Sequence, residues 1–318
     1  MKIVVGKAKP FIKWAGSKRS LLKQIQTFFP KQLLEGQIEH YHEPFLGSGA
    51  MFFHLAEHNL IRSAKLSDSN SDLILTYKVV QKNVDFLIEL LLAFQAEYDH
   101  LPVPEKEIYF KKVRETFNQE GIDFNYETPS YAWSRRASQF IFLNKTCYGG
   151  MFRVNSKGFY NVPFGKQKKP QIFDPKLLRT LSGLLQIATL EQADFQNVEK
   201  RLEEQSSENT FIYFDPPYRP LSATANFTSY QLSGFNDDDQ ETLGSLYRKL
   251  HERGAKLMLS NSDPKSENPE DNFFEDLYQG FSIYRVGALR RINSDFSKRG
   301  LKNELLITNY EVKDLDVQ

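Results

Sequence analysis

A glycine turn, Gly47-Ser48-Gly49, lies between a short strand-like run at 41–45 and a helical pattern at 50–57. A second strand-like run at 64–67 follows and ends at Asp68. Strand, glycine turn, helix, strand and acidic residue in this order open a doubly wound α/β sheet, in which ligands bind beyond the carboxyl ends of the strands. The sequence therefore predicts an α/β fold with a Rossmann-like, mostly parallel sheet.

Two glycines alone are typical of a tight turn, but the flanking strands and Asp68 favour a ligand site. Glycine lets the backbone approach a ligand closely, and an acidic side chain about twenty residues further on can accept hydrogen bonds from ribose hydroxyls. No third glycine follows Gly49, as it would in a site for the pyrophosphate of NAD. The pattern therefore favours S-adenosylmethionine, a nucleoside with a sulfonium tail.

The middle of the chain differs from this alternation. Helical patterns at 72–98, 105–119 and 131–143 follow one another without a clear strand, and a glycine-rich polar stretch at 144–170 fits a hairpin or an exposed loop. Strand and helix signals then alternate again, at 185–190, 192–205, 210–214, 237–253 and 256–259, before a possible antiparallel pair at 281–286 and 304–309. We expect one domain formed by 1–75 and 173–318, with 76–172 inserted as a second, mainly helical domain.

Composition narrows the class of protein. The 318 residues carry a net charge of +1, so any binding of nucleic acid must rest on local basic clusters. Cys147 is the single cysteine, which excludes an internal disulfide and any zinc site built from several cysteines. The longest apolar run, at 86–94, is too short to cross a bilayer, and the polar N-terminus does not fit a signal peptide. We expect a cytoplasmic monomer with no membrane partner and no metal.

An apolar strand at 211–214 runs directly into Asp215-Pro216-Pro217-Tyr218, here called the DPPY corner. Two prolines cannot continue a β-ladder, so they fix the backbone and leave carbonyl groups free to accept hydrogen bonds. The Asp215 carboxylate and a proline carbonyl could each accept one N–H of an exocyclic amine, while Tyr218 stacks on the ring that carries it. The alternative is a proline-rich turn with a capping aspartate. The corner alone leaves adenine, cytosine and RNA bases open.

These motifs together resemble the Dam-type DNA adenine-N6 methyltransferases of the alpha group, D12 class. The resemblance implies a class I methyltransferase fold, with a catalytic domain at 1–75 and 173–318 and a DNA target-recognition domain, including a β-hairpin, at 76–172. Ser17, where many relatives have glycine, and Gly149, where some have asparagine, depart from the family pattern. The matching segments are 10–18, 43–49, 67–74, 148–165, 215–218 and 259–262.

The resemblance also implies roles at the cofactor and in catalysis. Asp68 would hold the ribose of S-adenosylmethionine, Phe195 would stack on its adenine, and Asp215 would contact its methionine end as well as the target amine. Without the family, Trp14 would be read as a core residue and Lys18 as a solvated one. Catalysis is assigned to Asp215, Pro216, Pro217 and Tyr218, and cofactor binding to Trp14, Lys18, Phe45, Gly47, Gly49, Asp68, Asp194, Phe195 and Asp215.

A duplex hides the amino group of adenine, so the enzyme would flip the base out of the helix. Tyr148 could intercalate beside the flipped base, or it could be an ordinary buried tyrosine. Arg153 suits bidentate contact with guanine. By resemblance, Met151 and Arg153 contact bases of GATC, Pro163 lies on the thymine side, and Lys13 reads an outer guanine. The residues assigned to double-stranded DNA are Lys13, Tyr148, Met151, Arg153, Asn155, Pro163 and Lys166.

Two basic clusters could contact phosphates: Lys166, Lys168 and Lys169, and a second one comprising Arg290, Arg291, Lys298, Arg299 and Lys302. The expected reaction is direct attack of the amine on the methyl group, which leaves S-adenosylhomocysteine and needs no covalent enzyme intermediate. The rival interpretations are cytosine-N4 methylation, for which Ser is more usual at position 215, an RNA-directed enzyme, and a noncatalytic DNA-binding protein on a methylase fold. The sequence does not decide between a restriction system and a solitary enzyme.

Overall fold

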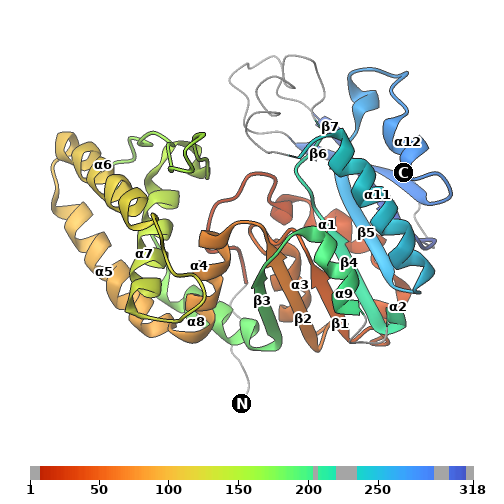
Figure 1. The fold of residues 1–318 in the computed structure, drawn as a ribbon, viewed down its shortest axis with the longest axis horizontal. Coiled ribbons are helices and arrows are strands. Elements are labelled where there is room, and N and C mark those ends of the chain that lie inside the picture. The colour runs from red at the N-terminus through yellow and green to blue at the C-terminus, as the bar shows by residue number, and fades with distance from the viewer. Residues whose placement is uncertain (1–7, 203–206, 220–234, 290–300, 313–318) are drawn as a thin grey trace. The chain divides into compact units, whose positions relative to one another are not determined.

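The computed structural model describes residues 8–202, 207–219, 235–289 and 301–312, except for the side chains at 288, 289, 301 and 302. The chain forms two compact units (Figure 1). The first unit comprises 1–19, 47–58 and 67–192, and the second unit comprises 20–46, 59–66 and 193–318. These are units of packing. The division into catalytic and recognition domains at 76 and 172 stays a prediction.

The predicted α/β fold is confirmed. The described residues form a seven-stranded sheet with the order β3-β2-β1-β4-β5-β7-β6. β1 pairs in parallel with β2 and β4, β4 pairs in parallel with β5, and β7 pairs antiparallel with β5 and β6. The strands are β1 His40–Glu43, β2 Ser63–Asp68, β3 Ala188–Gln192, β4 Thr210–Phe214, β5 Lys256–Ser262, β6 Ser282–Leu289 and β7 Leu301–Thr308.

The second unit is built on the buried strands β4 and β5. Every residue of β4 is buried, as a strand covered on both faces requires. The helix α11 (Asp237–Glu252) packs against β5 (Figure 1) and begins with a capping box in which Asn236 and Asp239 satisfy each other's backbone N–H groups. Shorter helices of this unit are α1 Leu22–Ile25, α2 Lys31–Leu34, α9 Val198–Leu202 and α12 Phe273–Leu277.

The first unit is mainly helical. α5 and α6 both pack on α7, and the three lie together in Figure 1. The single helix predicted over 72–98 is two helices, because Asn83 leaves helical geometry at φ −134° and ψ 38°. The helices are α3 Ala50–Glu57, α4 Ser71–Lys82, α5 Val84–His100, α6 Val103–Glu120, α7 Tyr131–Thr146 and α8 Pro175–Leu184.

A buried ion pair joins α4 to α7. Arg136 contacts both carboxylate oxygens of Asp72, with Nη2 to Oδ2 at 2.9 Å, and donates from Nη1 to the Phe117 carbonyl at 2.9 Å. The guanidinium lies 4.1 Å from the centre of the Phe117 ring, and the Tyr126 hydroxyl donates to Asp72 at 2.8 Å. This cluster fixes the two helices against each other.

Two other predicted helices are shorter than expected. The segment predicted as helical at 18–29 consists of α1 between two 3₁₀ turns, Lys18–Ser20 and Gln26–Phe28. The one predicted at 192–205 consists of the turn Phe195–Asn197 and α9, with 203–206 outside the described residues. Short apolar runs fix neither the length nor the type of a helix, which explains both differences. Within the described residues, no helix is long and apolar enough to cross a membrane.

Candidate active site and recognition segment

In the first unit, the glycine turn packs directly on Asp68. The backbone N–H of Gly47 donates to Asp68 Oδ2, and that of Asn70 donates to Oδ1, both at 3.0 Å. Burial raises the pKa of the Asp68 carboxyl, and these two hydrogen bonds counteract the rise. Each carboxylate oxygen keeps a second lone pair that a ligand hydroxyl could use.

Trp14 packs against the same turn at Gly47. Gly47 has φ +46°, and a Cβ there would lie 2.8 Å from Trp14 Cδ1, so only glycine fits. The indole stacks on Phe152 with the ring centres 5.9 Å apart and remains half-buried. The Trp14 side chain therefore packs directly on the glycine turn.

Lys18 and Ser17 join the N-terminal segment to this turn. Lys18 is only 3% exposed, and its Nζ donates to the Gly16 carbonyl at 2.7 Å, so the interpretation as a solvated lysine is wrong. The Ser17 hydroxyl is 2.8 Å from that of Ser48 in the glycine turn. The serine that departs from the family pattern thus forms a polar contact that glycine could not form.

The DPPY corner lies in the second unit, at the carboxyl end of β4. Pro216 is buried, whereas Asp215 and Tyr218 are partly exposed. The carbonyl of Pro217 accepts a hydrogen bond from Gln240 Nε2 at 3.1 Å. Among the residues that the structure describes, nothing donates to the Pro216 carbonyl. The sequence left open which proline carbonyl would accept; the Pro217 carbonyl already shares one of its two lone pairs with Gln240, which favours that of Pro216.

The Tyr218 hydroxyl donates to Glu304 Oε2 of β7 at 2.8 Å. Burial, together with the charges of Asp215 and Glu304, raises the pKa of Tyr218 well above its usual value. The phenol is therefore protonated. Its hydrogen bond to Glu304 holds the outer end of the ring, and the backbone of the corner holds the inner end.

Further tyrosines and an acid lie beneath the corner. Tyr213 shares a hydrogen bond of 2.6 Å with Ser260, and Tyr41 donates to Glu43 at 2.9 Å. Burial raises the pKa of Tyr213, and the charges of Asp215 and Glu43 raise it further. The carboxylates of Glu43, Asp215 and Glu304 all act on Tyr213, and their negative charge would stabilise positive charge that develops on a bound amine.

Phe45 and Phe195 form a stacked pair in the second unit, with ring centres 5.4 Å apart and planes inclined by 23°. Phe195 is buried in the core of this unit. Asp194 caps the turn that follows, because its carboxylate accepts the N–H of Gln196 at 2.9 Å. Their contact with a cofactor stays a prediction.

The recognition segment, residues 148–163, folds back on itself without a regular ladder. Isolated antiparallel bridges join Cys147 to Phe164 and Val154 to Tyr160. Tyr148 is 63% exposed, so its interpretation as a buried tyrosine is wrong, and Met151 and Pro163 are exposed as well. The segment thus exposes Tyr148, Met151 and Pro163, as contact with bases requires, whereas its Tyr160 and Val162 are buried.

Lys13 packs against this segment through Gly150. A Cβ on Gly150, which has φ +68°, would lie 2.2 Å from Lys13 Cδ, so a side chain there would displace the lysine. The buried Asn144 accepts the Lys13 N–H at 2.8 Å and donates to the carbonyls of Lys13 and Gly150. One asparagine thus fixes two predicted recognition elements relative to each other.

Arg153 is oriented by its neighbour. Its Nε donates to Asn161 Oδ1 at 2.8 Å, and its two terminal nitrogens bond to none of the described residues. Asn155 is exposed, and its Oδ1 accepts the N–H groups of Lys157 and Phe159 at 3.0 and 3.1 Å, which shapes the turn. Arg153 thus keeps the end of the guanidinium that can form a bidentate pair with guanine.

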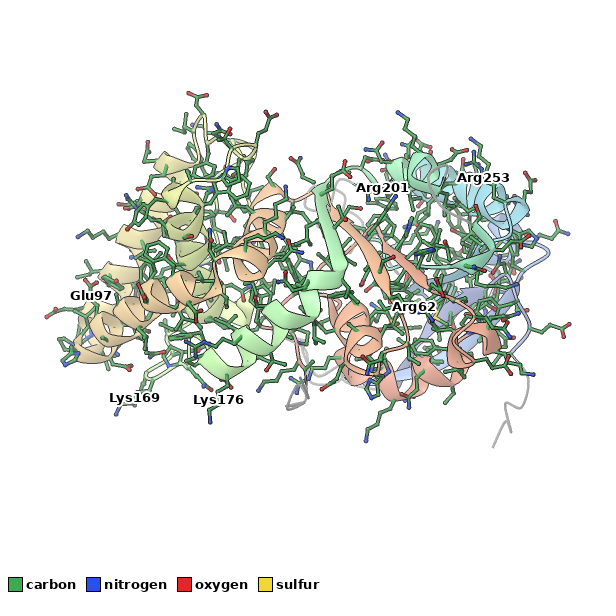
Figure 2. All side chains as sticks on the ribbon, turned by 90° about the horizontal axis from the view of Figure 1, so that it is seen from below. Arg62, Glu97, Lys169, Lys176, Arg201 and Arg253 are labelled. Atoms are coloured by element: carbon green, nitrogen blue, oxygen red, sulfur yellow. The ribbon has the colours of Figure 1, made fainter. Side chains whose placement is uncertain are left out.

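The cluster Lys166, Lys168 and Lys169 is exposed, and Figure 2 shows Lys169 projecting from the surface. A further lysine, Lys145, is more enclosed, and burial together with the charges of Lys13 and Lys9 lowers its pKa to about 8. Of the C-terminal cluster, Arg290, Arg291, Lys298 and Arg299 lie outside the described residues, as does the side chain of Lys302.

Sequence reasoning missed several side chains that hold the site. Asn144, Gln240 and Glu304 form their contacts across 131, 23 and 86 residues, so no local pattern points to them. Glu43 belongs to the segment 43–49, which resembles the family, and this resemblance could have pointed to Glu43 as a residue of the site. Among the described residues, no group of three or more His, Cys, Asp or Glu side chains could hold a metal ion.

Comparison with known proteins identifies the family. The sequence profile of the D12 class of N6 adenine-specific DNA methyltransferases matches residues 14–292. The Type II methyltransferase M.MjaIII of Methanocaldococcus jannaschii is 46% identical over 95% of this chain and 99% of its own length. The DNA adenine methylases of Serratia marcescens and Escherichia coli K12 are each 33% identical, over 94% of this chain and over 98% and 95% of their own lengths. The chain therefore belongs to the D12 class of N6 adenine-specific DNA methyltransferases.

Proposed function

We propose that this DNA adenine-N6 methyltransferase uses S-adenosylmethionine, flips its target adenine and acts on GATC in duplex DNA, as a monomer. The observation that carries the proposal is the DPPY corner, where Asp215 is partly exposed and the Pro216 carbonyl accepts no hydrogen bond from the described residues. Its relatives come from archaea and bacteria, in which DNA lies in the cytoplasm, so we place the enzyme there.

The first unit fits a nucleoside cofactor. Gly47 is partly exposed and packs against Trp14, and the carboxylate of Asp68 can accept ribose hydroxyls in addition to its two backbone hydrogen bonds. We propose contacts with the cofactor also for Lys18 and Gly49, and for Phe45, Asp194, Phe195 and Asp215 of the second unit. When bound, S-adenosylmethionine supplies a methyl group activated by its sulfonium.

The chemistry of the protein's own residues is positioning. Asp215 and the Pro216 carbonyl would each accept one N–H of the adenine amino group, which directs the nitrogen lone pair away from both acceptors. Tyr218 would stack on the flipped ring. The amine so held would take the methyl group from the sulfonium, forming an N–C bond as the S–C bond breaks; S-adenosylhomocysteine would leave, and the proton that the amine loses would pass to solvent. The negative charge around the corner favours the positive charge that builds up on the amine.

Sequencing of adenine methylation tests reaction and site together. The protein is expressed in cells that lack adenine methylation, and their DNA is sequenced for N6-methyladenine. We expect methylation in GATC that is absent when Asp215→Ala is expressed instead. Methylation in another sequence would overturn GATC alone, and N4-methylcytosine found by mass spectrometry would overturn the choice of base.

Replacing Asp68 by alanine should weaken cofactor binding by about 100-fold or more, because two charge-assisted hydrogen bonds of about 1.5 kcal/mol or more each are lost. Calorimetric titration with S-adenosylhomocysteine measures this. Only the ionised carboxylate accepts both hydroxyls, and burial raises its pKa. Wild-type affinity should therefore fall as the pH drops through this raised pKa, and the affinity of Asp68→Ala should not. If the affinities of wild type and Asp68→Ala depend on pH in the same way, Asp68 does not bind the cofactor.

Arg153→Ala should relax the sequence preference. The loss of one bidentate pair with guanine costs about 1–3 kcal/mol of discrimination. The ratio of kcat/KM for GATC over a duplex altered at the guanine should fall accordingly. Lys168→Ala is the matched control, because a phosphate contact weakens binding to both duplexes alike. An unchanged ratio for Arg153→Ala would assign guanine recognition to another residue.

A further inference from the structure

A chain of amide hydrogen bonds encloses the backbone of Tyr218. The N–H of Arg219 donates to Asn261 Oδ1 at 3.2 Å, Asn261 Nδ2 donates to Gln240 Oε1 at 3.1 Å, and Gln240 Nε2 donates to the Pro217 carbonyl at 3.1 Å. The peptide groups before and after Tyr218 are thus both held by the same two side chains.

Because its two amide side chains are buried, this series of hydrogen bonds can run in only one donor-to-acceptor direction. Gln240 is 1% exposed and Asn261 is fully buried. Asn261 Oδ1 also accepts the Ser262 N–H at 2.9 Å, so a flipped amide would set N–H groups against N–H groups. With Asn261 fixed, Gln240 must present its oxygen to Asn261 and its N–H to Pro217.

The residue after the corner is anchored as well. Arg219 pairs with Asp237 at 2.9 Å and with Asp271 at 2.8 Å, and its guanidinium lies 4.2 Å from the centre of the Phe273 ring. Together with the bond from Tyr218 to Glu304, the corner is held from α11, β5 and β7. A two-proline turn alone would leave the Tyr218 peptide free to rotate.

We propose that Gln240 is a positioning residue for methyl transfer, which holds the Tyr218 ring and the Pro216 carbonyl in fixed relation through the Pro217 peptide. The inference rests on the proposed role of the DPPY corner. Gln240 is buried and is not among the residues proposed to contact the cofactor, so its loss should lower the rate of the chemical step and leave cofactor affinity unchanged.

Gln240→Glu tests this directly. The ionised carboxylate can still accept from Asn261, but it cannot donate to the Pro217 carbonyl and repels it. A buried carboxyl has a raised pKa, and once protonated it can donate again. We expect the single-turnover rate at saturating DNA and S-adenosylmethionine to fall by up to about 100-fold at alkaline pH. Relative to wild type, the rate should recover as the pH drops through that pKa.

Gln240→Met removes both hydrogen bonds at similar volume, so its rate should stay low at every pH. Gln81→Glu is the matched control, since Gln81 Nε2 also donates to backbone carbonyls, those of Leu185 and Ala188 at 2.7 Å, in the first unit. Its rate and pH profile should match those of wild type.

Three results are distinguishable. A Gln240→Glu enzyme with the wild-type rate across the pH range would overturn the inference. A rate lost equally at all pH values, together with lost cofactor affinity and a lower Tm, would overturn it in favour of a purely structural role. Absence of adenine methylation by the wild type would instead contradict the proposed function.

Discussion

Asp215→Ala is expected to lower the single-turnover rate of adenine methylation by at least about 10²- to 10³-fold, the usual effect of deleting one oriented polar group from a preorganised site. Alanine removes the acceptor that orients the amine and a negative charge near the reacting nitrogen. Asp215→Asn keeps an acceptor oxygen without the charge, so its rate should lie between those of Asp215→Ala and wild type. The rates are measured with tritiated S-adenosylmethionine and a GATC duplex.

The control is Asp238→Ala, which removes an exposed carboxylate from the first turn of α11. Its rate should equal that of wild type. Duplex binding by Asp215→Ala, measured by gel shift, should persist, because the residues proposed to contact the phosphates and the other bases are different ones. Substantial methylation by Asp215→Ala would contradict the assignment of the corner as the catalytic motif.

The parts of the site that the sequence predicted are those encoded by consecutive residues. An apolar strand followed by two prolines specifies the DPPY corner locally, and the order of strands and helices specifies the parallel sheet. The position of Asp68 at the end of the second strand is likewise local, although its hydrogen bond from Gly47, at 3.0 Å, was not predicted. Each of these features depends on a short window of the chain.

What the sequence did not predict depends on contacts between distant segments. Gln240 is one polar residue on an amphipathic helix, and only the packing of α11 brings its amide to Pro217. Lys18 is charged, so its type indicates exposure, yet it is buried through its bond to the Gly16 carbonyl. Tertiary packing decides such cases against the local propensity of the residue.

The tertiary contact with the largest expected effect on stability is the pair of Asp72 and Arg136. Their side chains are 12% and 5% exposed, and Arg136→Met would leave the Asp72 carboxylate buried without its partner. Breaking a buried pair from one side costs about 3–5 kcal/mol in the free energy of unfolding. Both tryptophans, Trp14 and Trp133, lie in the first unit, so tryptophan fluorescence during urea unfolding reports on the unit that holds the pair.

The chain offers a matched control in the same unit. Arg179 pairs with Asp85 at 2.8 Å, but the two side chains are 55% and 73% exposed. Arg179→Met should therefore cost no more than about 1 kcal/mol, as is usual for exposed pairs. In the double variant with Asp72→Leu and Arg136→Met, no charge is left buried, so it should be more stable than Arg136→Met alone. If the two single Arg variants lose equal stability, burial does not govern this pair, and the link between α4 and α7 must rest on apolar packing.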